Sequence, residues 1–231
     1  PTMFIAELDH PRFAEFDLSC LRTGIMAGSP CPIETMKRVV TQMHMREVTI
    51  AYGMTETSPV SFQSSTTDPL ERRVSTVGRI QPHLEVKIVD SQGRTVPVGE
   101  KGELCTKGYA VMQGYWGDAA RTAEAIKDGW MFTGDLATID DEGFLSVVDR
   151  KKDMIKSGGE NVASREVEEG IYRLAGVSEV AVIGLPHPRW VEAVVSVVVR
   201  KPDAAALDEA ALLAHCALHL APFKSPKRVV F

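Results

Sequence analysis

Three short segments of the sequence carry side chains that a protein core does not need. In the first, residues 51–57 (AYGMTET), an aromatic ring precedes a glycine turn and a hydroxyl lies beside a carboxylate. The ring of Tyr52 can offer a flat face to a nucleobase, and Thr55 with Glu56 can hold a phosphate oxygen and its Mg²⁺, a cation that prefers oxygen ligands. The alternative is a strand-to-helix turn in which Thr55 caps the helix. This segment by itself leaves both interpretations open.

The second and third segments are also compatible with a nucleotide site. Within residues 129–135 (GWMFTGD), Asp135 follows a glycine in an apolar setting. A carboxylate there can accept both hydroxyls of a ribose, although a turn aspartate that bonds its own backbone is the alternative. Residues 149–153 (DRKKD) are either part of a site or a solvated charge run. The nearby pair Gly158 and Gly159 either lets a backbone approach a ligand or forms a simple turn.

Composition argues against several classes of protein. The 231 residues are 44% hydrophobic and 25% charged, as in an ordinary globular protein with room for a sizeable core. A net charge of -5 without a basic run argues against a nucleic-acid partner. The apolar stretches are strand-length and the N-terminus is not signal-like, which argues against a transmembrane segment or a signal peptide. Four cysteines without CxxC spacing argue against a zinc site or a disulfide framework, so we expect a cytoplasmic protein.

The elements that must position these residues begin with an α/β layer. Two apolar strands are predicted at residues 21–27 and 48–52, with a helix at about residues 33–43 between them. Each strand ends at a glycine turn, which is typical of a parallel sheet. Because ligands bind beyond the carboxyl ends of such strands, we expect residues 28–30 (GSP) and 53–56 (GMTE) to share one edge of the sheet.

The rest of the chain predicts a β-rich subdomain and then a small α+β domain. The first has short strands at residues 84–89, 102–106 and 144–148 and one helix at 118–127. The α+β domain begins with a helix that Ser164 is expected to cap and that carries Val167, Ile171 and Leu174 on one face. Two valine-rich strands follow at residues 177–185 and 191–199. A second amphipathic helix carries Leu213, Cys216, Ala217 and Leu220. The predicted fold class is therefore α/β with a β-rich subdomain, residues 1–149, followed by an α+β domain, residues 150–231.

The order of four motifs gives the chain a family resemblance. Along residues 18–231 the motifs are AGSP, AYGMTETSP, GWMFTGD and DRKKDMIKSGGENV. Together they resemble the adenylate-forming superfamily, which includes acyl-CoA synthetases, luciferases and peptide-synthetase adenylation domains. Within it, AGSPCP, STVGRIQPH and GYAVMQGYWGD are most similar to medium- and long-chain fatty acyl-CoA synthetases. The resemblance implies the adenylate-forming fold, incomplete here, with the C-terminal domain as a mobile lid.

The resemblance also implies an activity and its cofactors. Enzymes of this family use ATP and Mg²⁺ to convert a carboxylate into an acyl-adenylate and pyrophosphate, and then transfer the acyl group to coenzyme A. We therefore expect ATP or AMP, Mg²⁺ and coenzyme A as ligands, and a fatty acid as the substrate. The alternatives are an aryl acid, a carrier-protein thiol as acceptor, a luciferase-type oxygenase, or a non-catalytic nucleotide-binding or interaction module.

Residue roles on the nucleotide side follow from the same resemblance. Tyr52 stacks on the adenine, and Gly28 and Ser29 line the base. Gly53 belongs to the same nucleotide-binding set. Thr55 meets the phosphate and is expected to take part in catalysis.

The resemblance assigns further roles to charged residues. Glu56 coordinates Mg²⁺ and acts with Thr55 in catalysis, while Asp135 and Arg150 hold the ribose hydroxyls. Lys152 lies at the family's hinge position, where the small domain swings between the two half-reactions. Lys156 resembles a lysine that serves the second half-reaction.

The remaining implications concern the thioester step and two missing segments. Ser157, Gly158 and Gly159 border the pantetheine path. Val191 replaces a glycine that relatives usually have before a glutamate, and a β-branched residue would strain a turn with positive φ. The family's Gly-, Ser- and Thr-rich phosphate loop and its C-terminal catalytic lysine are not in this sequence. We therefore expect the C-terminal part of a longer synthetase, which is inactive on its own.

Overall fold

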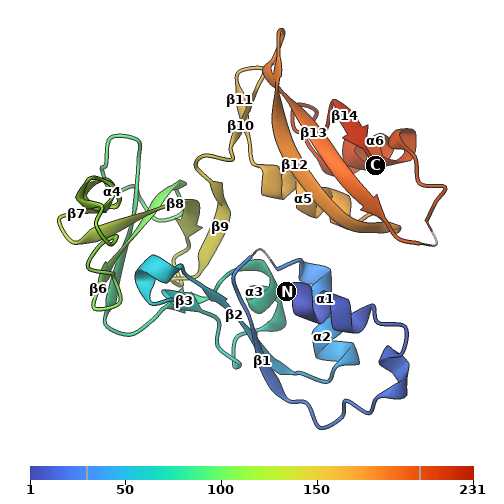
Figure 1. Cartoon of the computed structure of the whole chain (residues 1–231), viewed down its shortest axis with the longest axis horizontal. Helices are drawn as coiled ribbons and strands as arrows, with labels where there is room; N and C mark the ends of the chain where they lie inside the picture. Colours follow the sequence, from blue (N-terminus) through green and yellow to red (C-terminus); the bar gives the residue numbers. More distant parts are fainter. Residues whose placement is uncertain (30, 203) are drawn as a thin grey trace. The chain divides into compact units, whose positions relative to one another are not determined.

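The computed structural model describes residues 1–29, 31–202 and 204–231, which form two compact units, Pro1–Val147 and Val148–Phe231 (Figure 1). Pro30, which the sequence placed in the turn after the first strand, lies outside the described residues. The first unit contains an α/β layer and a β-rich subdomain, and the second has an α+β fold, so the predicted fold class is confirmed. None of the helices in the described ranges has the length and apolar character to cross a membrane.

The α/β layer is built on a sheet with the strand order β1-β2-β3-β4. β1 (Thr23–Met26) and β2 (Glu47–Tyr52) are parallel and are connected by α2 (Ile33–Gln42), as predicted. Sequence reasoning missed only short elements here, because two to seven residues show too little periodicity. These elements are α1 (Thr2–Leu8), η1 (Phe13–Glu15), η2 (Thr55–Thr57), β3 (Phe62–Gln63), α3 (Leu70–Ser75) and β4 (Arg79–Ile80).

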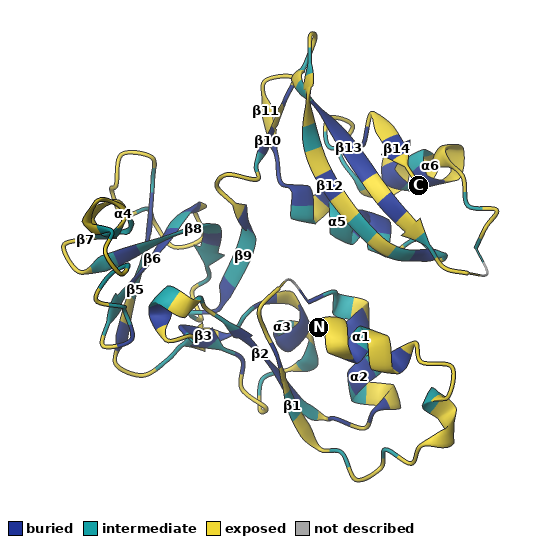
Figure 2. Cartoon of the chain, viewed as in Figure 1, coloured by how far each residue is buried: buried dark blue, intermediate teal, exposed yellow. Residues whose placement is uncertain are grey.

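A hydrophobic core holds this layer together. Met36 and Val39 of α2 belong to the same buried cluster as Met26 of β1 and Val48 of β2 (Figure 2). Phe4 of α1 joins that cluster. Burying an apolar side chain of this size contributes about 1.5–3 kcal/mol. The strands β1 and β2, whose carboxyl ends carry the candidate site residues, are therefore held in place by a well-packed core.

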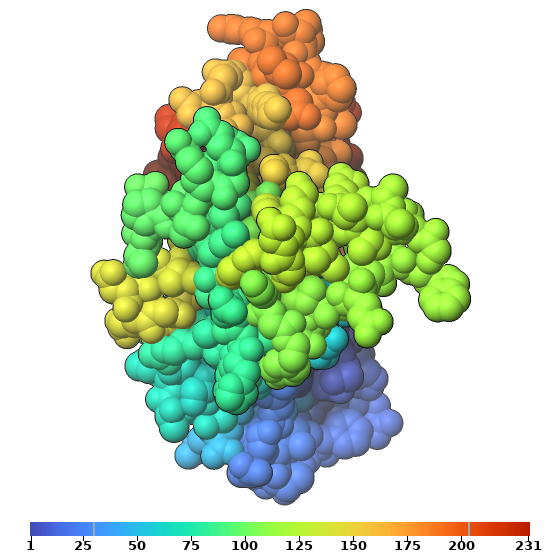
Figure 3. All heavy atoms as spheres, turned by 90° about the vertical axis from the view of Figure 1, so that its left-hand side faces the viewer, coloured from blue at the N-terminus to red at the C-terminus, as the bar shows by residue number. Residues whose placement is uncertain are grey.

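The β-rich subdomain is an antiparallel sheet with the order β5-β6-β8-β7, and β9 pairs with β8. Its elements are β5 (Leu84–Val89), β6 (Gly102–Gly108), α4 (Ala119–Ala125), β7 (Ile126–Lys127), β8 (Trp130–Ile139) and β9 (Leu145–Arg150). The predicted strands and the helix are present. The alternative of a turn at Asp135 is wrong, because this residue lies inside β8, where the register with β6 shifts at a bulge. Figure 3 shows the segment around α4, in yellow-green, at the surface of the first unit.

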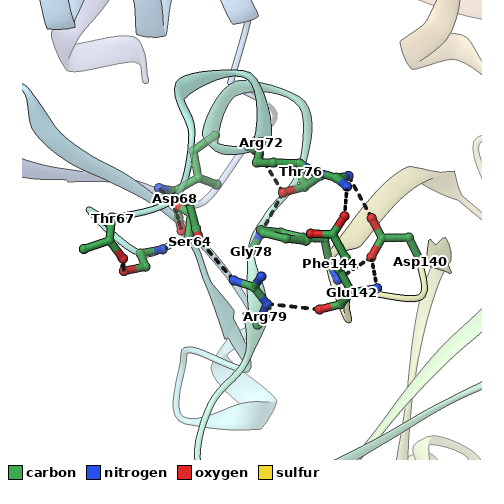
Figure 4. A network of polar contacts seen from close by, with 12 residues as sticks. Ser64, Thr67, Asp68, Arg72, Thr76, Gly78, Arg79, Asp140, Glu142 and Phe144 are labelled. Atoms are coloured by element: carbon green, nitrogen blue, oxygen red, sulfur yellow. Dashed lines mark hydrogen bonds and ion pairs between the residues drawn. The ribbon is translucent and has the colours of Figure 1, made fainter.

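Figure 4 shows a polar network that joins the two parts of the first unit. The guanidinium carbons of Arg79 and Arg72 lie 3.8 and 4.9 Å from the centroid of the Phe144 ring, in the turn after β8. Arg72 also donates to Asp140 at 2.8 Å and to Glu142 at 2.6 Å. Desolvation raises the pKa of Asp140, but the Phe144 N–H and the Arg72 charge outweigh it and hold this pKa below its ordinary value. The turn between β8 and β9 is thereby anchored to α3 and β4.

The second unit folds around a sheet with the order β11-β10-β13-β12, and β14 runs parallel to β13. Its elements are β10 (Ile155–Ser157), β11 (Glu160–Val162), α5 (Ser164–Tyr172), β12 (Val177–His187), β13 (Val191–Arg200), α6 (Glu209–His219) and β14 (Arg228–Val230). One buried cluster combines Ile171 of α5 and Leu212 of α6 with Val182 and Val194 of the long hairpin. The predicted helix, two strands and second helix occur in the expected order, and the short strands β11 and β14 are additional.

Ser164 does not cap α5, contrary to the prediction. It is the first helical residue, and Ala163 at the N-cap makes no side-chain cap. Instead, the buried carboxylate of Asp149, at the end of β9, accepts the Ser164 N–H at 2.6 Å and the Ser164 hydroxyl at 3.2 Å. A carboxylate at this position satisfies a free N–H and interacts favourably with the helix dipole. Asp149, the residue before Arg150, is therefore hydrogen-bonded to the first residue of α5.

Candidate functional site

The carboxyl ends of β1 and β2 lie at one edge of the sheet, as predicted. Because the two strands are parallel and Met26 is opposite Ile50, the residues that follow them leave the sheet on the same side. Gly28 and Ser29 follow β1 and are exposed. Gly28 has a φ of 84°, and a side chain there would meet nothing within 4 Å. Backbone conformation, and not crowding, favours glycine at this position.

Thr57, and not Thr55, closes the turn after β2. The Met54 N–H donates to the Thr57 hydroxyl at 3.3 Å, and that hydroxyl donates to the Met54 carbonyl at 3.1 Å. Met54 is the N-cap of η2, so the alternative in which Thr55 caps a helix is wrong. Thr55 is exposed, and no hydrogen bond among the described residues uses its hydroxyl. Its role toward a phosphate stays a prediction.

Gly53 lies where any side chain would collide with the backbone. A Cβ added there would be 1.7 Å from the Pro59 carbonyl oxygen. The Ser61 N–H donates to the Tyr52 carbonyl at 2.9 Å, so the chain returns to β2 after a short excursion. The loop that carries Thr55 and Glu56 is therefore closed tightly at its base.

The structure brings Tyr52 and Asp135 together across 83 residues of sequence. The Tyr52 hydroxyl donates to Oδ2 of Asp135 at 2.5 Å. The Tyr52 ring meets the Phe62 ring edge-on, with centroids 6.2 Å apart and an interplanar angle of 63°. The Asp135 N–H donates to the Thr133 hydroxyl at 3.1 Å. An aromatic face and a hydroxyl-binding carboxylate thus lie together beyond the end of β2, which is the chemistry that an adenosine requires.

Glu56 is held from a second segment of the first unit. Its carbonyl oxygen accepts the Met112 N–H at 2.9 Å, and its Oε1 accepts the Tyr115 hydroxyl at 2.8 Å. This hydrogen bond, burial and the negative charge of Glu56 together raise the pKa of Tyr115 above its ordinary value of 10.0. Sequence reasoning gave Tyr115 no role. The available signal was an aromatic residue between two glycines in the GYWGD run.

The oxygen donors at this edge fit a cation that arrives with a phosphate. Within the described part of the chain, no group of three or more His, Cys, Asp or Glu side chains could hold a metal ion. Glu56 supplies one carboxylate, and Thr55 beside it supplies one hydroxyl. Mg²⁺ keeps several waters and is usually held by one or two carboxylates together with substrate phosphates, not by a cage of protein ligands. The residues present therefore fit Mg²⁺ bound as a nucleotide complex.

In the second unit, the predicted hinge falls on a short turn. Arg150 ends β9, and the Asp153 N–H donates to the Arg150 carbonyl at 3.0 Å. Lys152 is exposed in this turn. The turn begins immediately after Asp149, which is fastened to α5. Arg150 and Asp135 belong to different units, so their shared role on a ribose stays a prediction.

Gly158 and Gly159 form the two-residue turn of the β10–β11 hairpin. Their φ values are 62° and 89°, and Ser157 pairs with Glu160 across the turn. A type I′ turn requires positive φ at both central residues, so the hairpin alone explains the glycine pair. The Lys156 side chain is exposed, and its N–H donates to the carboxylate of Glu192 at 2.6 Å. Contact with a pantetheine stays a prediction.

The β12–β13 hairpin supports this turn, and sequence reasoning missed its contribution. The Gly158 N–H donates to the Trp190 carbonyl at 2.9 Å. The Trp190 ring stacks on His187 with centroids 4.3 Å apart, and Nζ of Lys227 lies 5.7 Å from the Trp190 centroid. Val191 has a φ of 69°, the positive value that the family resemblance implied. The signal for this cluster was an aromatic residue among basic ones in HPRWVE.

Comparison with known proteins covers both units. The family model described as "AMP-binding enzyme" matches residues 1–116, and the model described as "AMP-binding enzyme C-terminal domain" matches residues 166–231. Over 233 residues the chain is 49% identical to "Putative acyl-CoA synthetase YngI" of Bacillus subtilis and 40% identical to "Medium-chain acyl-CoA ligase ACSF2, mitochondrial" of Bos taurus. Both alignments cover 100% of this chain, but 42% and 38% of those proteins.

A solved structure shows the same relationship. The crystal structure of ATP-bound MatB from Rhodopseudomonas palustris matches this chain with a TM-score of 0.88 at 33% identity. The match covers 100% of this chain and 45% of MatB. The chain therefore spans less than half of the length of these relatives.

Proposed function

Since the chain belongs to the AMP-binding enzyme family, we propose that the protein activates a carboxylic acid with ATP as an acyl-adenylate and passes the acyl group to coenzyme A. The observation that carries the proposal is the hydrogen bond between Tyr52 and Asp135 beyond the carboxyl end of β2. It combines an aromatic face with a ribose-type acceptor at the edge where Thr55 and Glu56 also lie. The names of the relatives support the same ligase chemistry.

In the first half-reaction, the first unit binds the nucleotide. Tyr52 stacks on adenine, with Gly28 and Ser29 beside the base, and Asp135 accepts a ribose hydroxyl. Because Tyr52 already holds the Asp135 carboxylate, this acceptor does not reorganise when the ribose arrives.

The phosphates are handled by the turn after β2. The exposed Thr55 hydroxyl donates to a phosphate oxygen, and Glu56 would hold Mg²⁺. When bound, Mg²⁺ supplies positive charge that stabilises the charge on the reacting phosphate.

We assign the second half-reaction to residues 150–231. Arg150 contributes to the ribose, and Lys152 is the proposed hinge of a mobile lid. Lys156 is the proposed catalytic residue, carried on the hairpin that Glu192 and Trp190 hold in place. The Trp190 ring with Lys227 offers an aromatic face and a cation, which suit the nucleotide end of coenzyme A.

We propose a fatty acid as the substrate. The similarity to a medium-chain acyl-CoA ligase supports an aliphatic acid, and aryl acids and carrier-protein thiols are the competing substrates. The 231-residue chain alone is proposed to bind nucleotide weakly and to be inactive, because the family's phosphate loop is not in its sequence. The cytoplasm is the proposed location, with no nucleic acid as a partner.

An acid panel tests the proposal. The complete gene product is incubated with ATP, Mg²⁺ and coenzyme A, and with fatty acids of increasing length or benzoate. Pyrophosphate release and the mass of any acyl-CoA are measured. Acid-dependent pyrophosphate release with fatty acyl-CoA as product is expected. Release of pyrophosphate without acyl-CoA would show that coenzyme A is the wrong acceptor, and no acid-dependent release at all would contradict the ligase proposal.

A second arm uses the 231-residue chain alone. Absence of acid-dependent ATP–pyrophosphate exchange is expected. Exchange by this chain would contradict its proposed inactivity, while leaving the proposed reaction intact.

A further inference from the structure

Glu56 is hydrogen-bonded to the segment that leads into α4. No residue of α4 is buried, although the helix has a regular N-cap, in which Asp118 accepts the Arg121 N–H at 2.9 Å (Figure 2). The segment before α4 reaches back to η2 through the Met112 N–H and the Tyr115 hydroxyl, both of which donate to Glu56. Two hydrogen bonds of this segment therefore end on the same residue, one on the Glu56 backbone carbonyl and one on its carboxylate, and the second spans 59 residues of sequence.

Tyr115 itself is fixed from several directions. Its N–H donates to the Thr122 hydroxyl at 2.9 Å, and the Arg121 guanidinium lies 4.8 Å from the centroid of its ring. Gly114 allows this approach, because a Cβ there would lie 2.8 Å from Thr122. The ring is thus held by α4, and among the described residues the hydroxyl at its far end donates to Oε1 of Glu56.

We propose that Tyr115 is a positioning residue for Glu56. Its hydroxyl occupies Oε1 and fixes the carboxylate orientation, so that the second oxygen of Glu56 is presented to the cation of a bound nucleotide complex. This inference rests on the proposed function, in which Glu56 holds Mg²⁺. Tyr115 acts through Glu56 and is not assigned a contact with substrate.

The arrangement is suited to such a role at physiological pH. A phenol is neutral there, so it orients the carboxylate without cancelling the negative charge that attracts a cation. A cationic partner would instead compete with Mg²⁺ for Glu56.

The test compares Tyr115→Phe with Tyr109→Phe in the complete gene product. Tyr115→Phe keeps the ring beside Arg121 and the N–H bond to Thr122, and it removes only the hydroxyl. Tyr109 is 78% exposed and no hydrogen bond of the described residues uses its hydroxyl, so it is the matched control. Calorimetry measures ATP affinity as a function of Mg²⁺ concentration, without turnover. Tyr115→Phe is expected to need about tenfold more Mg²⁺ for half-maximal binding, in keeping with a charge-assisted hydrogen bond, and Tyr109→Phe is expected to match the wild type.

A double-mutant cycle separates positioning from general structure. If Tyr115 acts through Glu56, Tyr115→Phe has no further effect on Mg²⁺-dependent binding in a Glu56→Gln background. An equal loss in both backgrounds would overturn the inference, as would a wild-type Mg²⁺ dependence in Tyr115→Phe. Wild-type protein without any Mg²⁺-dependent ATP binding would instead contradict the proposed function, and the inference with it.

A further measurement leaves Tyr115 unchanged, so its result does not depend on whether Tyr115→Phe folds correctly. With tyrosine labelled at Cζ for NMR, the Tyr115 Cζ signal at neutral pH is expected to shift in Glu56→Gln, because its hydroxyl loses the charged acceptor. An unchanged signal would show that the hydroxyl does not contact Glu56 in solution, which would overturn the inference.

Discussion

Two glycine turns, one in each unit, need glycine for different physical reasons. At Gly53 the φ lies outside the left-handed region, but an added Cβ would be 1.7 Å from the Pro59 carbonyl oxygen. At Gly159 the φ is 89°, and an added Cβ would meet nothing within 4 Å. Crowding excludes a side chain at the first turn, and the chirality of the backbone disfavours one at the second. A glycine in a motif is therefore not, by itself, a sign that a ligand approaches the backbone.

The largest effect is expected from Gly53→Ala. Because the obstructing atom belongs to the backbone, the loop that carries Thr55 and Glu56 must move, and we expect a loss of at least about 3 kcal/mol in the free energy of unfolding. Urea denaturation of wild type and variant measures it. A loss below about 1 kcal/mol would show that the loop closes less tightly than the structure indicates.

A smaller effect is expected from Gly159→Ala. The new side chain has room, so the cost is that of a left-handed conformation for an L-residue, about 1–2 kcal/mol. The same denaturation experiment applies, and nucleotide affinity in the first unit should not change. A cost as large as that of Gly53→Ala would remove the distinction between crowding and chirality.

Val191→Gly introduces a glycine at a position with positive φ, and we expect it to raise the free energy of unfolding by a still smaller amount. Val191 has a φ of 69° and is exposed, so glycine relieves a strained backbone without opening a cavity. The relief of about 1–2 kcal/mol is partly offset by the greater entropy of glycine in the unfolded chain, about 0.5–1 kcal/mol. A net gain of about 0.5 kcal/mol in unfolding free energy is expected. A loss would mean that Val191 contributes packing that its exposure does not suggest.

The smallest effect concerns pH. One carboxylate in each unit, Asp140 and Glu168, should change the free energy of unfolding with pH in opposite directions. The pKa of Asp140 lies below its ordinary 3.8, so its contribution is present above that pH and is lost as the pH falls through the folded value. Burial, which outweighs a hydrogen bond from the Val182 N–H, raises the pKa of Glu168 above 4.5. Stability from Glu168 therefore falls as the pH rises from 4.5 through its folded value.

Paired variants measure this difference. Unfolding free energy is followed from pH 3 to pH 8 in Asp140→Asn and Glu168→Gln. The first should weaken the rise in stability with increasing pH at the acid end, and the second should weaken the decline above pH 4.5. The same change of slope in both variants would contradict the opposite signs.

Local pattern predicted much of the fold. Apolar strands followed by glycine turns located β1 and β2, and helical spacing located α2, because these elements place Met26, Val48 and Met36 in one buried cluster. Pattern failed where an element depended on distant residues. Ser164 reads as a cap by residue type, but Asp149 supplies the acceptor from β9, 15 residues earlier. A turn was one alternative for Asp135, but this residue lies within β8, at the bulge between the residues that pair with β6.

The sequence by itself determined the order of the longer elements, the family, and the residue types at the proposed site, because periodicity, turn chemistry and motif order are local properties. Only the tertiary structure decided which of these residues meet. Tyr52 contacts Asp135, 83 residues away, because of how the strands pair and pack. Tyr115 contacts Glu56, 59 residues away, because of where the segment before α4 packs. Such contacts depend on how elements pack, and no short stretch of sequence carries that information.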